Sequence, residues 1–445
     1  MNAASTSGLS GSILQWSALD ERERATALRR PPLARSEELR GTVARIIAQV
    51  RADGDSAVRA LTRRFDGCEL ERFEVAEDEF AAAAERLDPT TRQAIDEAYT
   101  RIEMFHRATA PQAVCVETAP GVVCERILRP IERVGLYVPA GGAPLPSTAL
   151  MLGVPAQIAQ CPQVIVCTPA GVSRQIDAAV LYAASRCGIS RIFGIGGAQA
   201  IAAMAFGTES VPKCDKLFGP GNAWVTEAKR QVAAEFDGAA IDLPAGPSEV
   251  LVIADAQANP EAVAADLLAQ AEHGPDSQVI VIAADRLVLA ATIEALQRQL
   301  TQLPRAAIAS AALAHARVIL ADSLDEAVAI SNAYAPEHLI LNVDTPRRWF
   351  EKVANAGSIF LGRWSPESVG DYCSGTNHVL PTYGHARAAS GVSVASFVKQ
   401  ITVQELSADG LLGIGPCAAT MARAEGLQAH ERAVTRRLAL LGVSS

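Results

Sequence analysis

Short apolar runs alternate with helix-like segments from about residue 134 onward, and this alternation constrains the fold more than any other feature. The strand-like runs are rich in Val and Ile and lie at 164–167, 191–194, 250–253, 279–282, 318–320, 339–341 and 359–361. Helix-like sequence separates them, as over 177–186, 198–205 and 224–236. Parallel strands need such crossovers and are covered on both faces, so the pattern predicts parallel sheets flanked by helices.

The alternation falls into two blocks that meet near residues 244–247, which predicts two α/β units. The part of the chain before these two blocks has a different pattern. Residues 20–110 are predicted to be helical, with Gly54 interrupting one long periodic stretch and Asp88-Pro89 starting another helix. Strands are predicted at 113–117 and 121–124.

The tail is predicted to be extended over 392–406 and helical over 418–440. Such a segment has few internal partners, which suggests a small third unit packed on something else, such as a second subunit. We see no short tandem repeat and no low-complexity tract in the chain.

Composition excludes several classes of partner. The chain has 445 residues and a net charge of −9, whereas phosphate binding needs a basic surface, so we expect no nucleic acid. Arg22, Arg24, Arg29 and Arg30 cluster early in the chain, but Glu21 and Glu23 interleave the cluster, which is typical of a solvated face. No apolar run reaches the roughly 18 residues that a membrane span requires, and no secretory signal is visible at the start.

Nine scattered cysteines without a Cys-x-x-Cys pair indicate reduced, mostly buried thiols in a cytoplasmic protein.

The few histidines lie mostly late in the chain, in polar surroundings. Six of the seven stand at or after residue 273. Gln270 and His273 are three residues apart at the end of a predicted helix, so they share a face. Zinc readily accepts imidazole nitrogen and carboxylate oxygen. The pattern suggests a metal site assembled from distant segments.

Other polar segments are ambiguous when each is taken alone. Glu337-His338 in a loop could activate water and accept a proton, or could be one exposed residue and one packed histidine. The loop 370–378 is dense in hydrogen-bonding groups, which is frequent at functional sites. The glycine-rich turns 194–199 and 218–222 could bind a phosphate or simply join a strand to a helix. Tyr137 stands in a loop after another predicted strand, where its ring could stack on or hydrogen-bond a cofactor, or could be an amphipathic ring in a turn.

Five segments together resemble the histidinol dehydrogenase family, over about residues 20–440. They are Phe218-Gly-Pro-Gly-Asn222, Asp242-Leu-Pro-Ala-Gly-Pro-Ser-Glu-Val250, Gln270-Ala-Glu-His-Gly-Pro275, Tyr334-Ala-Pro-Glu-His338 and Gly370-Asp-Tyr-Cys-Ser-Gly-Thr-Asn-His-Val-Leu-Pro-Thr382. Each is too long for a chance match, and all occur in family order. The resemblance implies a four-electron, NAD-dependent oxidation of L-histidinol through L-histidinal to L-histidine.

The resemblance also implies the fold and the assembly. We expect two Rossmann-like doubly wound parallel-sheet domains, one formed by 20–136 with 248–384 and carrying most of the zinc and substrate site. The other, 137–247, would bind NAD. The C-terminal extension, 385–445, would reach the partner in a domain-swapped homodimer with shared active sites.

The site residues that the resemblance implies fall into four groups. The catalytic pair would be Glu337 and His338. One zinc ion per subunit would be held by Gln270, His273, Asp371 and His430. These ligands and His338 would also contact the substrate, together with Ser248, His378 and Glu425. NAD would be bound by Tyr137, Gln199 and Asn222.

Two other classes of function remain as alternatives. A zinc-dependent hydrolase could use the same ligands to activate water, and it would not need NAD. A two-lobed protein could bind an imidazole ligand without turnover. The formation of NADH from histidinol distinguishes the dehydrogenase from both.

Overall fold

The computed structural model describes residues 13–30, 37–140, 143–171, 175–243 and 246–442. It divides into two compact units, the first formed by 1–109 with 132–396 and the second by 110–131 with 397–445. The first unit holds two parallel sheets with helices, and the second holds an antiparallel sheet with two helices. The predicted α/β class with two parallel sheets is therefore confirmed.

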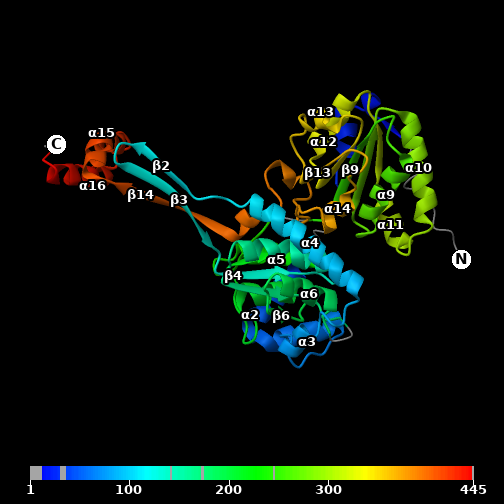
Figure 1. Cartoon of the computed structure of the whole chain (residues 1–445), viewed down its shortest axis with the longest axis horizontal. Helices are drawn as coiled ribbons and strands as arrows, with labels where there is room; N and C mark the ends of the chain where they lie inside the picture. The colour runs from blue at the N-terminus through cyan, green and yellow to red at the C-terminus, as the bar shows by residue number, and fades with distance from the viewer. Residues whose placement is uncertain (1–12, 31–36, 141–142, 172–174, 244–245, 443–445) are drawn as a thin grey trace. The chain divides into compact units, whose positions relative to one another are not determined.

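The larger sheet of the first unit, sheet A, has the order β1-β11-β10-β9-β12-β13, and all its strands are parallel (Figure 1). Its strands are β1 (Leu14–Gln15), β9 (Glu249–Ala254), β10 (Gln278–Ala283), β11 (Arg317–Leu320), β12 (His338–Asn342) and β13 (Ser358–Leu361). Every residue of β9, β10 and β12 is buried. Strands buried on both faces explain the continuous apolar runs in the sequence.

The two faces of sheet A are covered by different helices. Val250 and Val252 face one apolar cluster, with α9 (Pro260–Ala271), α10 (Arg286–Leu300) and α11 (Ala306–Leu313). Leu251 and Ile253 face the other cluster, which includes α12 (Leu324–Tyr334). Successive residues of one strand thus fill two separate cores, as the period of two requires.

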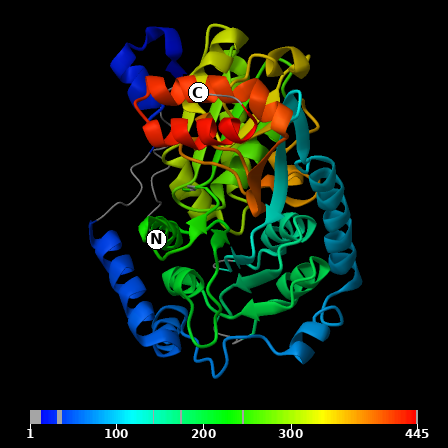
Figure 2. The ribbon, with the colours of Figure 1, turned by 90° about the vertical axis from the view of Figure 1, so that its left-hand side faces the viewer.

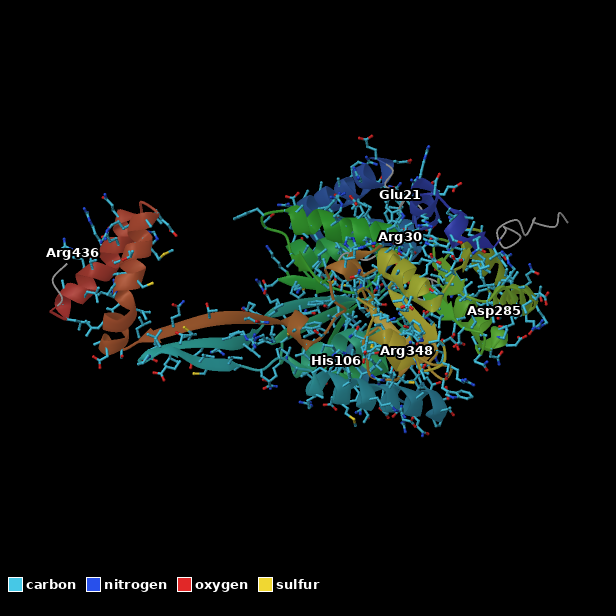
Figure 3. All side chains as sticks on the ribbon, turned by 90° about the horizontal axis from the view of Figure 1, so that it is seen from above. Glu21, Arg30, His106, Asp285, Arg348 and Arg436 are labelled. Atoms are coloured by element: carbon cyan, nitrogen blue, oxygen red, sulfur yellow. The ribbon has the colours of Figure 1, made fainter. Side chains whose placement is uncertain are left out.

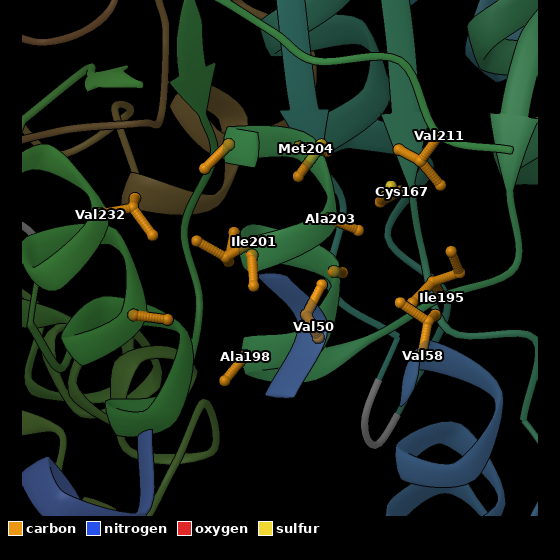
Figure 4. Close-up of a cluster of buried hydrophobic side chains, with 14 of the residues drawn as sticks. Val50, Val58, Cys167, Ile195, Ala198, Ile201, Ala203, Met204, Val211 and Val232 are labelled. Carbon is orange, nitrogen blue, oxygen red and sulfur yellow. The ribbon is translucent and has the colours of Figure 1, made fainter. Parts of the chain in front are cut away.

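The second parallel sheet, sheet B, has the order β6-β5-β4-β7-β8. Its strands are β4 (Arg133–Tyr137), β5 (Gln163–Cys167), β6 (Arg191–Phe193), β7 (Lys216–Phe218) and β8 (Ala240–Ile241). The helices α7 (Gly197–Phe206) and α8 (Ala223–Ala234) pack with α2 (Glu37–Asp66) in one core, which Figure 4 shows. The helices α5 (Pro146–Ile158) and α6 (Ala178–Arg186) pack against each other and against α4 (Pro89–Ala108).

Both sheets reverse their strand order once. In sheet B the chain runs from β4 outward through β5 to β6 and then returns to the other side of β4 with β7. In sheet A it runs from β9 through β10 to β11 and returns beside β9 with β12. Such switch points, at the carboxyl ends of the strands, are where open α/β sheets usually bind ligands.

The N-terminal helices follow the prediction closely. They are α1 (Glu21–Ala27), α2 (Glu37–Asp66), α3 (Glu77–Ala81) and α4 (Pro89–Ala108). Gly54 interrupts α2 with φ 53° and ψ −132°, a conformation that glycine adopts without strain. The Asp88 side chain caps α4 by accepting a hydrogen bond from the backbone N–H of Thr91.

The second unit is a three-stranded antiparallel sheet with a helix pair. Its strands are β2 (Val114–Ala119), β3 (Val122–Pro130) and β14 (Val398–Leu406), with β3 in the middle. The helices α15 (Ala408–Ala424) and α16 (Gln428–Leu440) pack against each other, as Figure 2 shows in orange and red. The prediction of one helix over 418–440 is wrong in extent, because Gly426 adopts φ 74° and ends the first helix.

Three smaller expectations have mixed outcomes. None of the nine cysteines forms a disulfide, and only four of them are buried, so the expectation that most are buried is wrong. Arg30 does not lie on a solvated face, because its side chain is only 12% exposed. Among the described helices, none is both long and apolar enough to cross a membrane.

Candidate active site

The catalytic pair that the resemblance implies lies at the amino end of sheet A, not at its carboxyl end. His338 is the first residue of β12, and Glu337 directly precedes that strand. His338 pairs in register with Val250 of β9 and Ser358 of β13, both near the start of their strands. Ser248 directly precedes β9 and therefore lies at the same end of the sheet. Most of the residues of the expected site lie near this end.

The His338 imidazole is oriented so that one nitrogen remains available. Its Nδ1 lies 3.1 Å from the carbonyl oxygen of Glu249, and a carbonyl can only accept, so Nδ1 carries the proton when the ring is neutral. Its Nε2 then has a lone pair. That atom is buried and has no hydrogen-bond partner among the described residues, with Asp371 Oδ1 3.6 Å away. The geometry suits a proton acceptor.

Two buried carboxyl groups face the same ring. Glu337 Oε2 lies 3.6 Å and Glu367 Oε1 3.7 Å from His338 Nδ1. Burial raises the pKa of Glu337 to about 8, and burial likewise raises the pKa of Glu367 to about 8, with the His338 charge opposing both shifts. Burial lowers the pKa of His338, but the nearby Glu367, Glu337 and Asp371 outweigh burial and raise it well above its ordinary value. The cluster is therefore an acid–base centre that titrates near or above neutral pH.

A set of nitrogen and oxygen donors lies beside this cluster. Gln270 is fully buried on α9, and neither its amide nitrogen nor its amide oxygen has a partner among the described residues. The helix α14 (Glu367–Tyr372), which carries Asp371, packs against α9. His273 Nδ1 lies 2.9 Å from the carbonyl oxygen of Ala269, so the lone pair of the neutral ring is on Nε2. An unpaired buried amide is costly, which favours a ligand at this position.

Asp371 links the donor set to the acid–base centre. Burial raises its pKa, but the positive charges of His338, His378 and His273 outweigh burial and lower it. Asp371, Glu367 and His338 also offer ligand atoms that all lie within 4.8 Å of one another. Gly370, next to Asp371, permits this arrangement, because a Cβ there would lie 2.5 Å from Cε1 of Phe360 on β13.

The loop after α14 makes polar side-chain contacts with α5 and α4, two helices near sheet B. His378 Nδ1 lies 2.8 Å from the carbonyl oxygen of Asp371, and its Nε2 lies 3.3 Å from Thr148 Oγ1 on α5. Asn377 donates from Nδ2 to the carbonyl oxygen of Met151 at 2.6 Å and lies 3.3 Å from Nε2 of His106 on α4. His106 is buried, and burial lowers its pKa to about 4, so the ring is neutral at pH 7. No local pattern in the sequence indicates this supporting contact of His106.

The expected NAD residues lie at the carboxyl end of sheet B. Tyr137 ends β4 and Phe218 ends β7, the two strands that flank the switch point. Gly219 has φ 124°, and a Cβ there would lie 2.1 Å from the carbonyl oxygen of Tyr137. Only glycine allows the two strand ends to approach so closely. The neighbouring Gly141 and Gly142 lie outside the described residues, as do Pro244 and Ala245 of another quoted segment.

The side chains of these residues are bonded within the protein. The Tyr137 hydroxyl accepts a hydrogen bond from the backbone N–H of Gly197 at 3.0 Å, and burial raises its pKa to about 12. Gln199 donates to Asp66 Oδ2 at 3.3 Å. Asn222 caps α8 by accepting from the backbone N–H groups of residues 224 and 225. The turns thus present helix amino ends, which attract phosphate, at the switch point.

Glu425 and His430 belong to the second unit. Glu425 directly follows α15 as its C-cap residue, His430 lies in the first turn of α16, and both are exposed. The structure thus brings together seven of the expected substrate, metal and catalytic residues in the first unit: Ser248, Gln270, His273, Glu337, His338, Asp371 and His378.

Sequence reasoning missed several residues around His338. Glu367 is buried and faces the imidazole, and its one available signal was its position four residues before Asp371 on the same helix face. Arg30 and Glu249 form a buried ion pair behind the catalytic residues. The two residues are 219 positions apart in the sequence, so no local pattern could reveal the contact.

Two parallel sheets, a glycine-lined switch point and a buried acid–base centre define an α/β enzyme. The family model described as histidinol dehydrogenase matches residues 29–438. A histidinol dehydrogenase of Xanthomonas euvesicatoria pv. vesicatoria is 60% identical over 427 residues, which cover 96% of this chain and 99% of the relative. One from Vibrio vulnificus strain YJ016 is 54% identical over 430 residues, which cover 97% of this chain and 99% of the relative.

A solved structure agrees with the sequence matches. The crystal structure of histidinol dehydrogenase from Elizabethkingia anophelis has a TM-score of 0.92 and 48% identity, covering 96% of this chain and 98% of that one. The chain belongs to the histidinol dehydrogenase family and is therefore an NAD-dependent oxidoreductase. The family expected from the five motifs is confirmed, whereas the zinc-hydrolase alternative has no support.

Proposed function

We propose that this chain oxidises L-histidinol through L-histidinal to L-histidine, using two NAD in turn at the site around His338. The observation that carries this proposal is the His338 Nε2 atom, which is buried, has no hydrogen-bond partner among the described residues and lies 3.6 Å from Asp371 Oδ1. A dehydrogenase of alcohols needs a base beside the hydroxyl group, and Nε2 carries the lone pair of the neutral ring, as such a base requires.

In the first oxidation, His338 accepts the proton of the substrate hydroxyl. The carbinol C–H bond breaks at the same time, and its hydride goes to the nicotinamide ring of NAD. The products are the aldehyde, NADH and one proton. His378, with its ring held by Asp371 and Thr148, and Ser248 at the start of β9 are proposed to orient the substrate.

In the second oxidation, Glu337 accepts a proton from water as the oxygen attacks the aldehyde carbon. His338 returns the proton it took from the alcohol to the carbonyl oxygen, so the hydrate forms and the imidazole is a base again. His338 then takes a proton from the resulting hydrate, and a second hydride leaves to a second NAD. A pKa of about 8 makes the Glu337 carboxylate a stronger base than an ordinary glutamate, and the group is ionised and able to accept a proton from water mainly above that pH. Its Oε2 accepts from the backbone N–H of Glu249 at 2.8 Å, which fixes the carboxylate.

Gln270, His273, Asp371 and the His430 of a second copy are proposed to hold one zinc ion. The unpartnered amide of buried Gln270, the free lone pair of His273 and the lowered pKa of Asp371 fit such an ion. When bound, zinc would anchor the imidazole and amine nitrogens of the substrate. Tyr137, Gln199 and Asn222 are proposed to contact NAD, supported by their place at the switch point of sheet B.

The test is turnover of histidinol with excess NAD while NADH absorbance is followed. We expect two NADH per histidinol consumed, loss of activity after chelation, and recovery in step with zinc content. One NADH per histidinol would contradict the four-electron reaction. Full activity in protein shown to be metal-free would exclude a required ion, and histidinol binding without NADH would indicate a binding protein.

We also propose that the active enzyme is a homodimer in which the second unit of each copy completes the site of the other. Glu425 and His430 are exposed in this unit, so they are available to contact the substrate and the zinc ion in the proposed site of the other copy. The same unit exposes many large apolar side chains, which supports burial against a second copy. They include Val114, Val116, Ile401, Leu406, Leu412, Met421, Leu427, Leu440 and Leu441.

Mixed dimers test this sharing. The variants His338→Asn and His430→Ala should each be inactive alone. After mixing and subunit exchange, half of the dimers contain one of each, and one of their two sites is intact if His430 acts across the dimer. We expect recovery of about a quarter of the wild-type rate. No recovery, with exchange verified by native mass spectrometry, would place His430 in its own subunit's site.

A cytoplasmic location is proposed as well, supported by the nine cysteines without a disulfide. The net charge of −9 supports the expectation that nucleic acid is not a partner.

A further inference from the structure

We propose that Arg30 and Glu249 form a positioning pair that sets the catalytic geometry of Glu337 and His338. The inference rests on the proposed roles of those two residues. The backbone of Glu249 contacts both of them. Its N–H donates to Glu337 Oε2 at 2.8 Å, and its carbonyl oxygen lies 3.1 Å from His338 Nδ1. A shift of this one residue would therefore move the water-activating carboxylate and change the protonated nitrogen of the base.

The side chain of Glu249 is in turn fixed by Arg30. Glu249 is fully buried, and the guanidinium pairs with both carboxylate oxygens, through Nε to Oε1 and through Nη2 to Oε2 at 2.8 Å. The backbone N–H of Tyr383 donates to Oε1 at 3.0 Å. A two-point pair of this kind fixes orientation as well as distance, which a single contact with lysine would not.

Arg30 also holds the turn that leads to the catalytic pair. Its Nη2 donates to the carbonyl oxygens of Tyr334 at 3.0 Å and of Ala335 at 3.2 Å, and its guanidinium lies 3.8 Å from the centre of the Tyr334 ring. Ala335 adopts φ 55° and ψ 70°, a left-handed conformation that is unfavourable for alanine. A strained turn persists only where its surroundings hold it, and Pro336, Glu337 and His338 follow directly.

One guanidinium therefore connects the two strands whose amino ends form the acid–base centre. Arg30 follows α1 and is labelled in Figure 3, Glu249 starts β9, and the Tyr334–Ala335 turn leads into β12. Catalysis depends on geometry within about half an ångström, so a loosened pair should reduce the chemical step while leaving substrate binding largely intact.

The test compares Arg30→Lys with Arg24→Lys. Arg24 is a matched control, because it also lies over an aromatic ring, that of Trp16 at 5.4 Å, and donates to the Trp16 carbonyl oxygen, but it does not contact Glu249. We expect Arg30→Lys to lower kcat for both oxidations by about 10-fold or more, with KM for histidinol and NAD changed by less than about threefold. Arg24→Lys should keep wild-type kcat.

Imidazole ¹⁵N NMR supplies a readout that does not depend on turnover. The His338 signal, assigned as the one missing in His338→Asn, should show the Nδ1–H tautomer in the wild type at a pH where the ring is neutral. In Arg30→Lys we expect a mixture of tautomers. If that variant fails to fold, Glu249→Gln should show the same kcat loss and tautomer change, because glutamine cannot accept both guanidinium bonds.

A wild-type kcat together with an unchanged tautomer in a folded Arg30→Lys variant would overturn the positioning role. So would a kcat loss that only matches the unfolded fraction seen by thermal denaturation. The NMR comparison does not need an active enzyme, so it separates failure of this inference from failure of the proposed function.

Discussion

Replacing His338 with asparagine is expected to lower the rates of both oxidations by a factor of about 10³. Asparagine can still donate an N–H to the carbonyl oxygen of Glu249, so the local fold should survive. It has no basic nitrogen to put in place of Nε2, the atom that we propose to accept the hydroxyl proton and later the hydrate proton. The defect should therefore appear in kcat for L-histidinol and for L-histidinal alike.

Stopped-flow measurement of NADH with each substrate separately checks this expectation. The control is His315→Asn, because His315 is exposed and lies in the turn between α11 and β11, which carry none of the residues of the proposed site. The control should retain wild-type rates. If His338→Asn oxidises histidinol at the wild-type rate, the base for alcohol oxidation is another residue.

Replacing Glu337 with glutamine should separate the two half-reactions. Glutamine matches the shape of glutamate, and its amide oxygen can still accept from the backbone N–H of Glu249. It cannot deprotonate water, so oxidation of the aldehyde should fall by about 10² or more, while oxidation of the alcohol should change by less than about threefold. L-Histidinal should then accumulate, or one NADH per histidinol should form rapidly.

The two rates are best compared at alkaline pH, where each has reached its plateau. This choice matters because the Glu337 carboxylate is one of the charges that raise the pKa of His338. Without it, the histidine should lose its proton at lower pH, and the alcohol rate near pH 7 should shift for that reason alone. Equal losses in both half-reactions at the plateau would argue against Glu337 as the residue that activates water.

Much of the fold was predictable because its signals are local. Valine- and isoleucine-rich runs identify β9 and β10, whose residues are buried on both faces of sheet A. Asp88 followed by proline marks the start of α4, since both residues act within one helical turn. The division of the tail helix at Gly426 was missed, although a glycine inside a helical pattern is also a local signal.

The candidate site was predictable only in part. The five motifs lead to the family and to the residues that we propose for catalysis, and the structure brings Glu337, His338 and Asp371 together. Arg30 was misread, because alternating arginine and glutamate is typical of an exposed helix, whereas its partner Glu249 lies far along the chain. That the site uses the amino end of sheet A follows from strand order and register, which no local pattern contains.

The antiparallel sheet of the second unit combines strands that the ribosome makes at very different times. The hairpin of β2 and β3 leaves the ribosome early, but its other neighbour, β14, follows only after roughly 270 more residues, on the order of tens of seconds later at usual elongation rates. Until then one edge of β3 has no strand beside it. A nascent chain therefore carries an exposed hairpin edge while most of the first unit is being made, which makes the hairpin a natural place for a chaperone to act.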